Sequence, residues 1–256
     1  NMRLGIIQGR LSKPDNGFQD TPLNWETEFE DLSNLGLSHV EWIVTKQSFS
    51  NNPIFFSDVK GLPINSICAD NVVSDMIYDR SFLEHNLVPI CATAQKNDIK
   101  NITIPLLEDS SVEGLDVLKK FCASFAKICN SFKSLTFSLE TELSIEKIPY
   151  LLDISDNVGL TYDTGNSTSY EVSHIDYIER FHDMITNVHI KDRTIDGNSV
   201  RPTLGDTDFD LIFSTLLKNG YRNPFTLQTM RERTGLEKQT ILNHSKIIRR
   251  IYEQNK

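Results

Sequence analysis

Acidic, imidazole and cationic side chains stand where several short apolar runs of this sequence end. Glu140 closes LTFSLE, Asp163 closes VGLTYD, and His189 lies near the end of TNVHIK. Two carboxylates about 4 Å apart repel by roughly 4 kcal/mol at an effective dielectric constant near 20. A divalent cation would neutralise that repulsion, and carboxylate and imidazole ligands suit Mn²⁺, Co²⁺ or Zn²⁺. The residues therefore predict a metal site or, alternatively, separate acids that cap helices or pair with Lys191 or Arg193.

Cationic residues near the same run ends suggest where a substrate would bind. Arg10 follows the first run directly, in QGRLS, and Lys191, Arg193 and Arg201 lie in or after the seventh run. In an acidic chain such cations suit a phosphate or carboxylate group on a small substrate, and solvated loop charge with local ion pairs is the alternative. Other polar candidates for the substrate site are Glu41, Asp70 and Asn166.

The elements that must position these residues alternate along the chain. Continuous apolar runs, typical of buried parallel strands, occupy residues 3–8, 39–44, 64–69, 101–106, 135–140, 158–163, 186–191 and 224–229. Helical periodicity follows at 24–36, 115–132, 207–220 and 237–253. Eight units in about 250 residues favour a (β/α)₈ barrel, whose active sites lie at the carboxyl ends of the strands. An open doubly wound sheet is the alternative, but no GxGxxG follows the first run.

Composition narrows the function classes. The 256 residues carry 35 acids and 26 basic residues, so the net charge is −9, which disfavours nucleic acid and anionic membranes as partners. The four cysteines lack zinc-site spacing and are interpreted as reduced thiols. No apolar run approaches the ~18 residues of a membrane span, and the start lacks a signal-peptide layout. We expect a cytoplasmic protein with one domain over residues 1–256.

The same run ends carry a resemblance to a known family. The sequence resembles the xylose isomerase-like barrels, the sugar phosphate isomerase/epimerase superfamily that includes endonuclease IV. Segments that resemble its strands five to eight are SLE at 138–140, TYDTGN at 161–166, NVHIKD at 187–192 and LGDTDFDLIFSTLLKNGYRNPFTLQT at 204–229. Segments similar to a hexulose-6-phosphate isomerase-like subgroup are GIIQGRLS at 5–12, WETEFEDLSNLGLSHVEWI at 25–43, SICAD at 66–70 and IPLLEDSS at 104–111. The resemblance covers essentially the whole chain and implies a single TIM barrel.

The resemblance also implies a ligand set. In the family a glutamate, an aspartate, a histidine and a second glutamate on strands five to eight hold a divalent metal, with Mg²⁺ as a further candidate. The first three correspond to Glu140, Asp163 and His189. The fourth position holds Gln228, whose amide oxygen would bind a metal more weakly and cannot accept a proton. The turn at Gly165 and Asn166 would then shape the space beside Asp163.

Gln228 leaves the reaction open. In the family two glutamates exchange protons with the substrate through an enediolate, and here that pair is broken. Another carboxylate could replace it, first Glu142, which shares a strand face with Glu140, or else Glu41, Asp70 or Glu108. Alternatively, the reaction needs one base, as in a dehydratase or aldolase-like step, or the protein binds a sugar without turnover.

We expect a metal-dependent isomerase or epimerase of a small sugar or sugar phosphate, and a homo-oligomer, as in many relatives. A nuclease is disfavoured by the charge and by the single histidine among the matched ligands. Trp42 and Phe18 could stack on a sugar, although Trp42 suits the core equally. The polar segment 192–206 could close over the substrate. The other histidines are interpreted as surface or helix residues: His39, His85, His174, His182 and His244.

Overall fold

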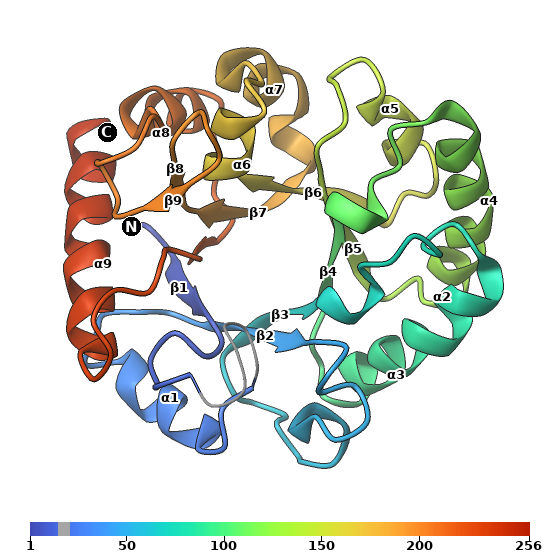
Figure 1. Ribbon diagram of the computed structural model, residues 1–256, viewed down its shortest axis with the longest axis horizontal. Coiled ribbons are helices and arrows are strands. Elements are labelled where there is room, and N and C mark those ends of the chain that lie inside the picture. Colours follow the sequence, from blue (N-terminus) through green and yellow to red (C-terminus); the bar gives the residue numbers. More distant parts are fainter. Residues whose placement is uncertain (15–20) are drawn as a thin grey trace. The chain divides into compact units, whose positions relative to one another are not determined.

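The protein is described by a computed structural model that covers residues 1–14 and 21–256; Phe18 lies outside these residues. In the described chain, eight parallel strands form a closed barrel in the order β1-β10-β7-β6-β5-β4-β3-β2. The strands, labelled in Figure 1, are β1 (Leu4–Ile7), β2 (Val40–Val44), β3 (Ile64–Ala69), β4 (Asn101–Leu106), β5 (Thr136–Thr141), β6 (Val158–Asp163), β7 (Ile185–Ile190) and β10 (Phe225–Leu227). The predicted (β/α)₈ barrel is confirmed, and the doubly wound alternative is excluded.

The strands form where the sequence has continuous apolar runs. Every residue of β1, β2 and β6 is buried, as expected for parallel strands that are covered on both faces. The eighth strand is shorter than the predicted 224–229. Its ladder continues one residue further, because the backbone N–H of Gln228 donates to the carbonyl of Ile190 at 2.9 Å. After that residue, the carbonyl of Thr229 accepts a side-chain hydrogen bond instead.

The described chain groups into two compact units. The first contains residues 1–14, 22–40 and 162–256, and the second contains residues 21 and 41–161. Strands β2 and β6 contribute residues to both. The prediction that residues 1–256 form one domain stays a prediction.

The second unit packs its helices on β3, β4 and β5. These helices are η1 (Pro53–Phe55), η2 (Asp70–Val72), α2 (Arg80–Asn86), α3 (Val88–Lys96), η3 (Glu108–Ser110), α4 (Leu115–Ser131) and α5 (Ile148–Leu152). On α4, Phe121 and Phe125 stack at 5.1 Å, and Phe125 packs edge-on against Phe137 of β5 at 5.2 Å. Helix α4 agrees with the predicted 115–132. Helices α2 and α3 were not predicted, because Pro89, in the first turn of α3, interrupts the helical pattern.

The first unit contains β1, β10 and β7 with the helices α1 (Trp25–Leu32), α6 (Thr164–Ser169), α7 (His174–Phe181), η4 (His182–Met184), α8 (Phe209–Lys218) and α9 (Glu237–Gln254). Helices α7, α8 and α9 follow one another in Figure 1. Asp208 caps α8 by accepting from Leu211 N at 3.0 Å.

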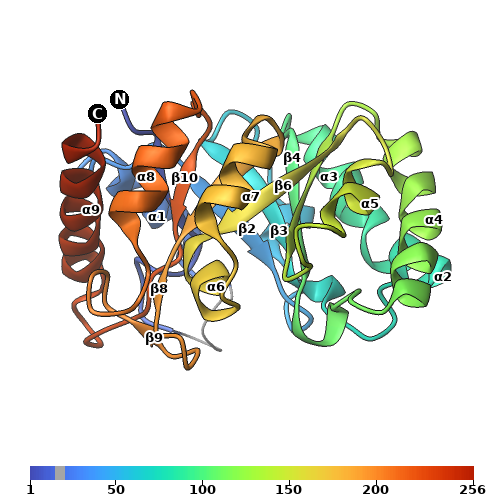
Figure 2. The same ribbon diagram turned by 90° about the horizontal axis from the view of Figure 1, so that it is seen from above.

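A small hairpin stands at one end of the first unit. It consists of β8 (Asp192–Arg193) and β9 (Ser199–Val200), which pair antiparallel. Figure 2 shows this hairpin at the same end of the unit as α6, with the two chain termini at the other end. Among the described helices, none combines the length and the apolar character that a membrane crossing requires.

Candidate functional site

Asp163 belongs to a strand and a helix at once. It is the last residue of β6 and the N-cap of α6, where its Oδ1 accepts from Asn166 N at 2.8 Å. Its Oδ2 lies 3.4 Å from the ammonium nitrogen of Lys191, and the Asp163 side chain is 2% exposed. The alternative prediction, a helix cap paired with Lys191, therefore holds at this residue: Oδ1 caps the helix and Oδ2 faces the lysine.

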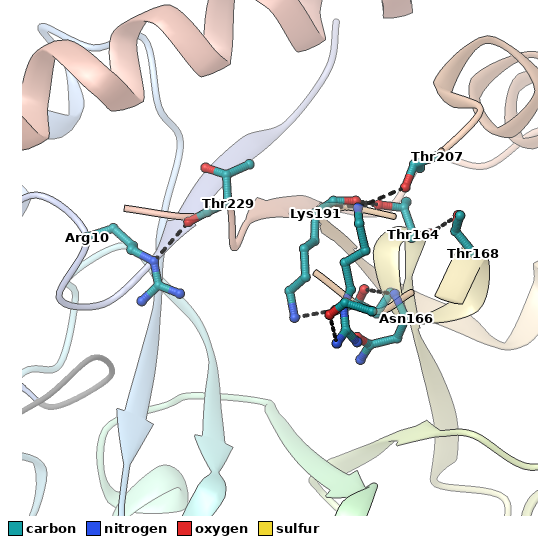
Figure 3. A network of polar contacts seen from close by, with 10 residues as sticks. Arg10, Thr164, Asn166, Thr168, Lys191, Thr207 and Thr229 are labelled. Carbon is teal, nitrogen blue, oxygen red and sulfur yellow. Dashed lines mark hydrogen bonds and ion pairs between the residues drawn. The ribbon is translucent and has the colours of Figure 1, made fainter. Parts of the chain in front are cut away.

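The turn after Asp163 is closed by β7. Thr164 Oγ1 donates to the carbonyl of Lys191 at 2.6 Å, and it accepts from the N–H of Lys191 at 3.0 Å; both residues appear in Figure 3. A Cβ on Gly165 would lie 2.9 Å from Cγ of Arg193 and 3.0 Å from Cγ of Lys191. Glycine is therefore needed at this position because two cationic side chains cross directly over it.

His189 and Gln228 lie on one face of neighbouring strands. His189 on β7 is the register partner of Thr226 on β10, and Gln228 follows Thr226 by two residues. Register partners in a parallel pair face the same side, and so do residues two apart in a strand. His189 is fully buried and Gln228 is 8% exposed. Within the described chain the amide oxygen of Gln228 has no hydrogen-bond partner, so a buried acceptor remains for a ligand.

Glu140 approaches the same place from β5. The register of β5 with β6 pairs Leu139 with Leu160, so Glu140 lies beside Thr161. Asp163 follows Thr161 by two residues and therefore points to the same face of the sheet. One ligand atom from each of Glu140, Asp163 and His189 lies within 4.8 Å of the other two. All three residues are buried. We call these three residues the ligand cluster; its two carboxylates and one imidazole are donors that suit a divalent transition-metal ion.

A cluster of charged side chains, Arg10, Glu28 and Arg231, surrounds the turn after β1; of these, Arg10 was a predicted site residue. Gly9 has a positive φ of 91°, and its N–H donates to Glu28 Oε2 at 2.9 Å. Arg10 Nε donates to the carbonyl of Thr229 at 3.1 Å (Figure 3), and Arg231 donates to the carbonyl of Gly9. Burial raises the pKa of Glu28 to about 7 and lowers the pKa of Arg10 to about 9. Glu28 lies in the first turn of α1, where it is buried and holds the turn after β1.

Arg193 and Asn166 bind to each other. Arg193 Nη1 donates to Asn166 Oδ1 at 2.8 Å, while its Nε and Nη2 donate to the carbonyl of Gly197 at 3.1 and 2.6 Å. Arg201, by contrast, is half-exposed and pairs with Glu232, with Nε 2.7 Å from Oε1. The rim cations predicted from the sequence therefore have different partners.

Asp192 anchors the segment 192–206. Its carboxylate accepts from the N–H groups of Thr203, Gly205 and Thr207 at 2.8, 3.0 and 3.2 Å, and it is fully buried. A side chain on Gly205 would clash with this carboxylate. Within the segment, β8 pairs with β9, so the segment is a tied hairpin in this structure.

Glu41 and Trp42 lie in the interior of the second unit. Glu41 is fully buried and accepts from Thr103 Oγ1 at 2.6 Å, which identifies a buried hydrogen-bonded acid. Trp42 is fully buried and donates from Nε1 to Asn52 Oδ1 at 2.9 Å, which favours its core interpretation.

The remaining acidic candidates follow strand ends. Asp70 begins η2, Glu108 begins η3, and Glu142 is half-buried just after β5. None of the three belongs to the ligand cluster.

Two histidines have buried hydrogen-bond partners; His39 was wrongly interpreted as a surface or helix residue, whereas His244 lies on a helix as predicted. His39 is buried, and its Nε2 lies 2.9 Å from Thr226 Oγ1. His244 on α9 is fully buried, with Nε2 2.6 Å from Glu232 Oε2 and Nδ1 2.7 Å from Thr229 Oγ1. Burial lowers the pKa of His244. Local spacing does not reveal either residue, because their partners lie far away along the chain.

Comparison with known proteins supplies the family and related folds. The family model of the xylose isomerase-like TIM barrel matches residues 87–250, more than half of the chain. None of the curated proteins matches the chain significantly.

Three similar solved structures cover nearly the whole chain. The 3-keto-D-glucoside 4-epimerase YcjR from E. coli has a TM-score of 0.69 and 18% identity, covering 98% of this chain and 100% of that chain. An L-ribulose 3-epimerase has a TM-score of 0.74 and 16% identity, covering 100% and 96%. The IOLI protein, solved with a bound zinc atom, has a TM-score of 0.74 and 14% identity, covering 100% and 99%. At these identities the likeness shows the fold alone.

Proposed function

The chain belongs to the xylose isomerase-like TIM barrel family, and from that premise we propose that it is a divalent-metal-dependent isomerase or epimerase of a small sugar or sugar phosphate. The observation that carries the proposal is the buried ligand cluster, three donors within 4.8 Å of one another at strand ends. The substrate class is supported by similar structures that are sugar epimerases, and the metal by the zinc atom of a third.

The residues present fit a metal ion. Glu140, Asp163 and His189 would be its ligands, and the buried amide oxygen of Gln228, which has no hydrogen-bond partner in the described chain, would be a fourth donor without charge. Such a donor set suits Mn²⁺, Co²⁺ or Zn²⁺, with Mg²⁺ as the harder alternative. When bound, the ion would polarise a substrate carbonyl and lower the barrier to loss of a neighbouring proton.

The proton transfers would fall to the carboxylates of the chain. Glu140 is the proposed base, because it is the carboxylate of the ligand cluster that does not cap a helix. Gln228 cannot take the second role, so Glu142, half-buried two residues beyond Glu140, is the proposed partner. Lys191, whose side chain is 18% exposed, would hold a substrate oxygen.

The other proposed substrate contacts rest on the sequence. Arg10, Glu41, Asp70, Asn166, Arg193 and Arg201 stay predictions as substrate ligands. Homo-oligomerisation also stays a prediction.

A non-catalytic sugar-binding barrel is the second candidate, and the neutral Gln228 favours it. Such a protein would keep the metal and the fold, but it would catalyse no proton exchange between a sugar and water.

The test combines elemental analysis with hydrogen exchange. The purified protein is expected to contain a divalent metal and to incorporate deuterium from D₂O next to the carbonyl of at least one of a panel of ketoses and their phosphates, followed by proton NMR. Glu140→Gln should abolish this incorporation and leave the circular dichroism spectrum unchanged.

Glu142→Gln is the matched variant, and it should slow the incorporation less than Glu140→Gln does. Full incorporation by Glu140→Gln would refute the role of that residue. A metal-loaded wild-type protein that exchanges no proton with any ketose would favour the binding barrel.

A further inference from the structure

The first unit contains a pocket of about 460 Å³ that shares no residue with the ligand cluster. One wall is the face of α9 that carries Asn243, Lys246 and Arg250. Further lining comes from Arg201 and from the segment before α9, with Glu232 and Arg233. Its volume lies in the ~300–1,000 Å³ range of small-molecule sites.

The charge of this pocket opposes that of the chain. Its lining carries four cations, Arg201, Arg233, Lys246 and Arg250, against the single carboxylate of Glu232, while the chain as a whole has a net charge of −9. Within residues 1–14 and 21–256, no carboxylate oxygen lies within 4.0 Å of the charged nitrogens of Arg233, Lys246 or Arg250; the ion pairs of the pocket join Glu232 to Arg201 and His244. Three cations of one pocket thus remain without a counter-charge from the described chain.

The carboxylate of Glu232 is already engaged. Its Oε1 accepts from Arg201 Nε at 2.7 Å, and its Oε2 lies 2.6 Å from Nε2 of the fully buried His244. His244 is fixed in turn by Thr229 Oγ1 at 2.7 Å. These contacts pair the carboxylate of Glu232 with Arg201 and His244. The other three cations of the lining, Arg233, Lys246 and Arg250, therefore give the pocket a positive potential.

We propose that this pocket binds a small organic phosphate. Guanidinium groups bind phosphate oxygens through paired hydrogen bonds, and an ammonium group adds a point charge, so Arg233, Lys246 and Arg250 supply the donors that a phosphate needs. The amides of Gln239 and Asn243 offer partners for hydroxyl groups, and Leu236 and Ile247 offer apolar contact for a carbon skeleton. The site shares no residue with the ligand cluster; Arg201, which lines it, is also a predicted substrate contact of the proposed reaction and is left unchanged in the test.

The test is calorimetric titration with sn-glycerol 3-phosphate at low ionic strength, since this compound has no carbonyl group to react. The wild-type protein is expected to bind it, and Lys246→Gln/Arg250→Gln to bind it at least about 10-fold more weakly, because two charge-assisted contacts are lost. Both side chains are exposed, so this variant should keep the thermal unfolding midpoint of the wild type.

Lys119→Gln/Lys127→Gln on α4 is the matched control, because it removes two exposed lysines from the surface of another helix. It should bind like the wild type, and so should Glu140→Gln. Inorganic phosphate should bind at the same place but more weakly, and glycerol should not bind. No heat with glycerol 3-phosphate, equal weakening in both double variants, or loss of binding in Glu140→Gln alone would overturn the proposal; equal affinity for inorganic phosphate would overturn the organic ligand.

Discussion

The ammonium group of Lys191 lies 3.4 Å from Oδ2 of Asp163, so a positive charge of the chain stands beside a proposed metal ligand. A divalent ion bound to the same carboxylate would be repelled by this ammonium group, and in a buried site such repulsion is only weakly screened. If the site holds a metal as proposed, Lys191 would therefore limit how tightly that metal binds.

Lys191→Met is expected to tighten metal binding by about 10-fold, because it removes this repulsion while keeping the aliphatic stem. Equilibrium dialysis of the metal-free protein against Mn²⁺ measures the change. The same variant should weaken substrate binding if Lys191 holds a substrate oxygen. Lys133→Met, which breaks an exposed pair with Asp156, is the control and should leave metal affinity unchanged. Weaker metal binding in Lys191→Met would contradict the repulsion argument.

Gln228→Glu is expected to raise metal affinity by about 10-fold, since it adds a negative charge at the proposed fourth donor. Deuterium incorporation into ketoses then separates the two candidate functions. Gained incorporation identifies a barrel that has lost a base, whereas lost incorporation shows that the wild-type enzyme uses the glutamine. Gln95→Glu, an exposed change elsewhere, is the control. Unchanged metal affinity in Gln228→Glu would remove Gln228 from the ligand set.

Asp192→Ala is expected to release the segment 192–206, because three backbone N–H groups lose their shared acceptor. The free energy of unfolding should fall by about 3 kcal/mol, and the amides of Thr203, Gly205 and Thr207 should exchange hydrogen faster. Asp196→Asn, an exposed change in the same segment, should leave both quantities near their wild-type values. Unaltered exchange at these three amides in Asp192→Ala would show that the hairpin alone holds the segment.

Glu28→Gln tests the buried charge cluster through pH. Burial raises the pKa of Glu28 from 4.5 to about 7, so the folded state binds more protons than the unfolded state between these values. The stability of the wild type relative to Glu28→Gln should therefore fall as the pH rises from about 4.5 to about 7, by about 3 kcal/mol, and level off above. Urea unfolding at several pH values measures it.

Glu30→Gln, an exposed acid on the same helix, is the control and should show no such slope. A constant difference between wild type and Glu28→Gln from pH 4.5 to 7 would contradict the raised pKa.

The barrel and the ligand cluster could be predicted because both follow from strand ends. Once Glu140, Asp163 and His189 are assigned to successive parallel strands, the closed sheet brings their side chains to one place. The sequence also showed that Gln228 stands where the family has a glutamate. Only the structure shows that its oxygen is buried and has no hydrogen-bond partner among residues 1–14 and 21–256.

Contacts between distant segments were not predictable in the same way. In the sequence Glu28 resembles any acidic residue of a helix; the structure shows that it accepts a hydrogen bond from the N–H of Gly9, 19 residues earlier. His244 looks like a helix residue until Thr229 and Glu232 close around it. Asp192 follows the seventh apolar run, but its carboxylate is occupied by backbone groups 11 to 15 residues away. In each case the tertiary partner determines the role.

Strand β6 passes into α6 with no residue between them, and Asp163 stands at the junction. Because Oδ1 is hydrogen-bonded to the first turn of α6, the start of the helix fixes the direction in which Oδ2 points. Inserting a single glycine after this junction would turn the oxygen away from Glu140 and His189, the other two residues of the ligand cluster. Retuning this corner for a metal of another size would accordingly mean redesigning the start of the helix.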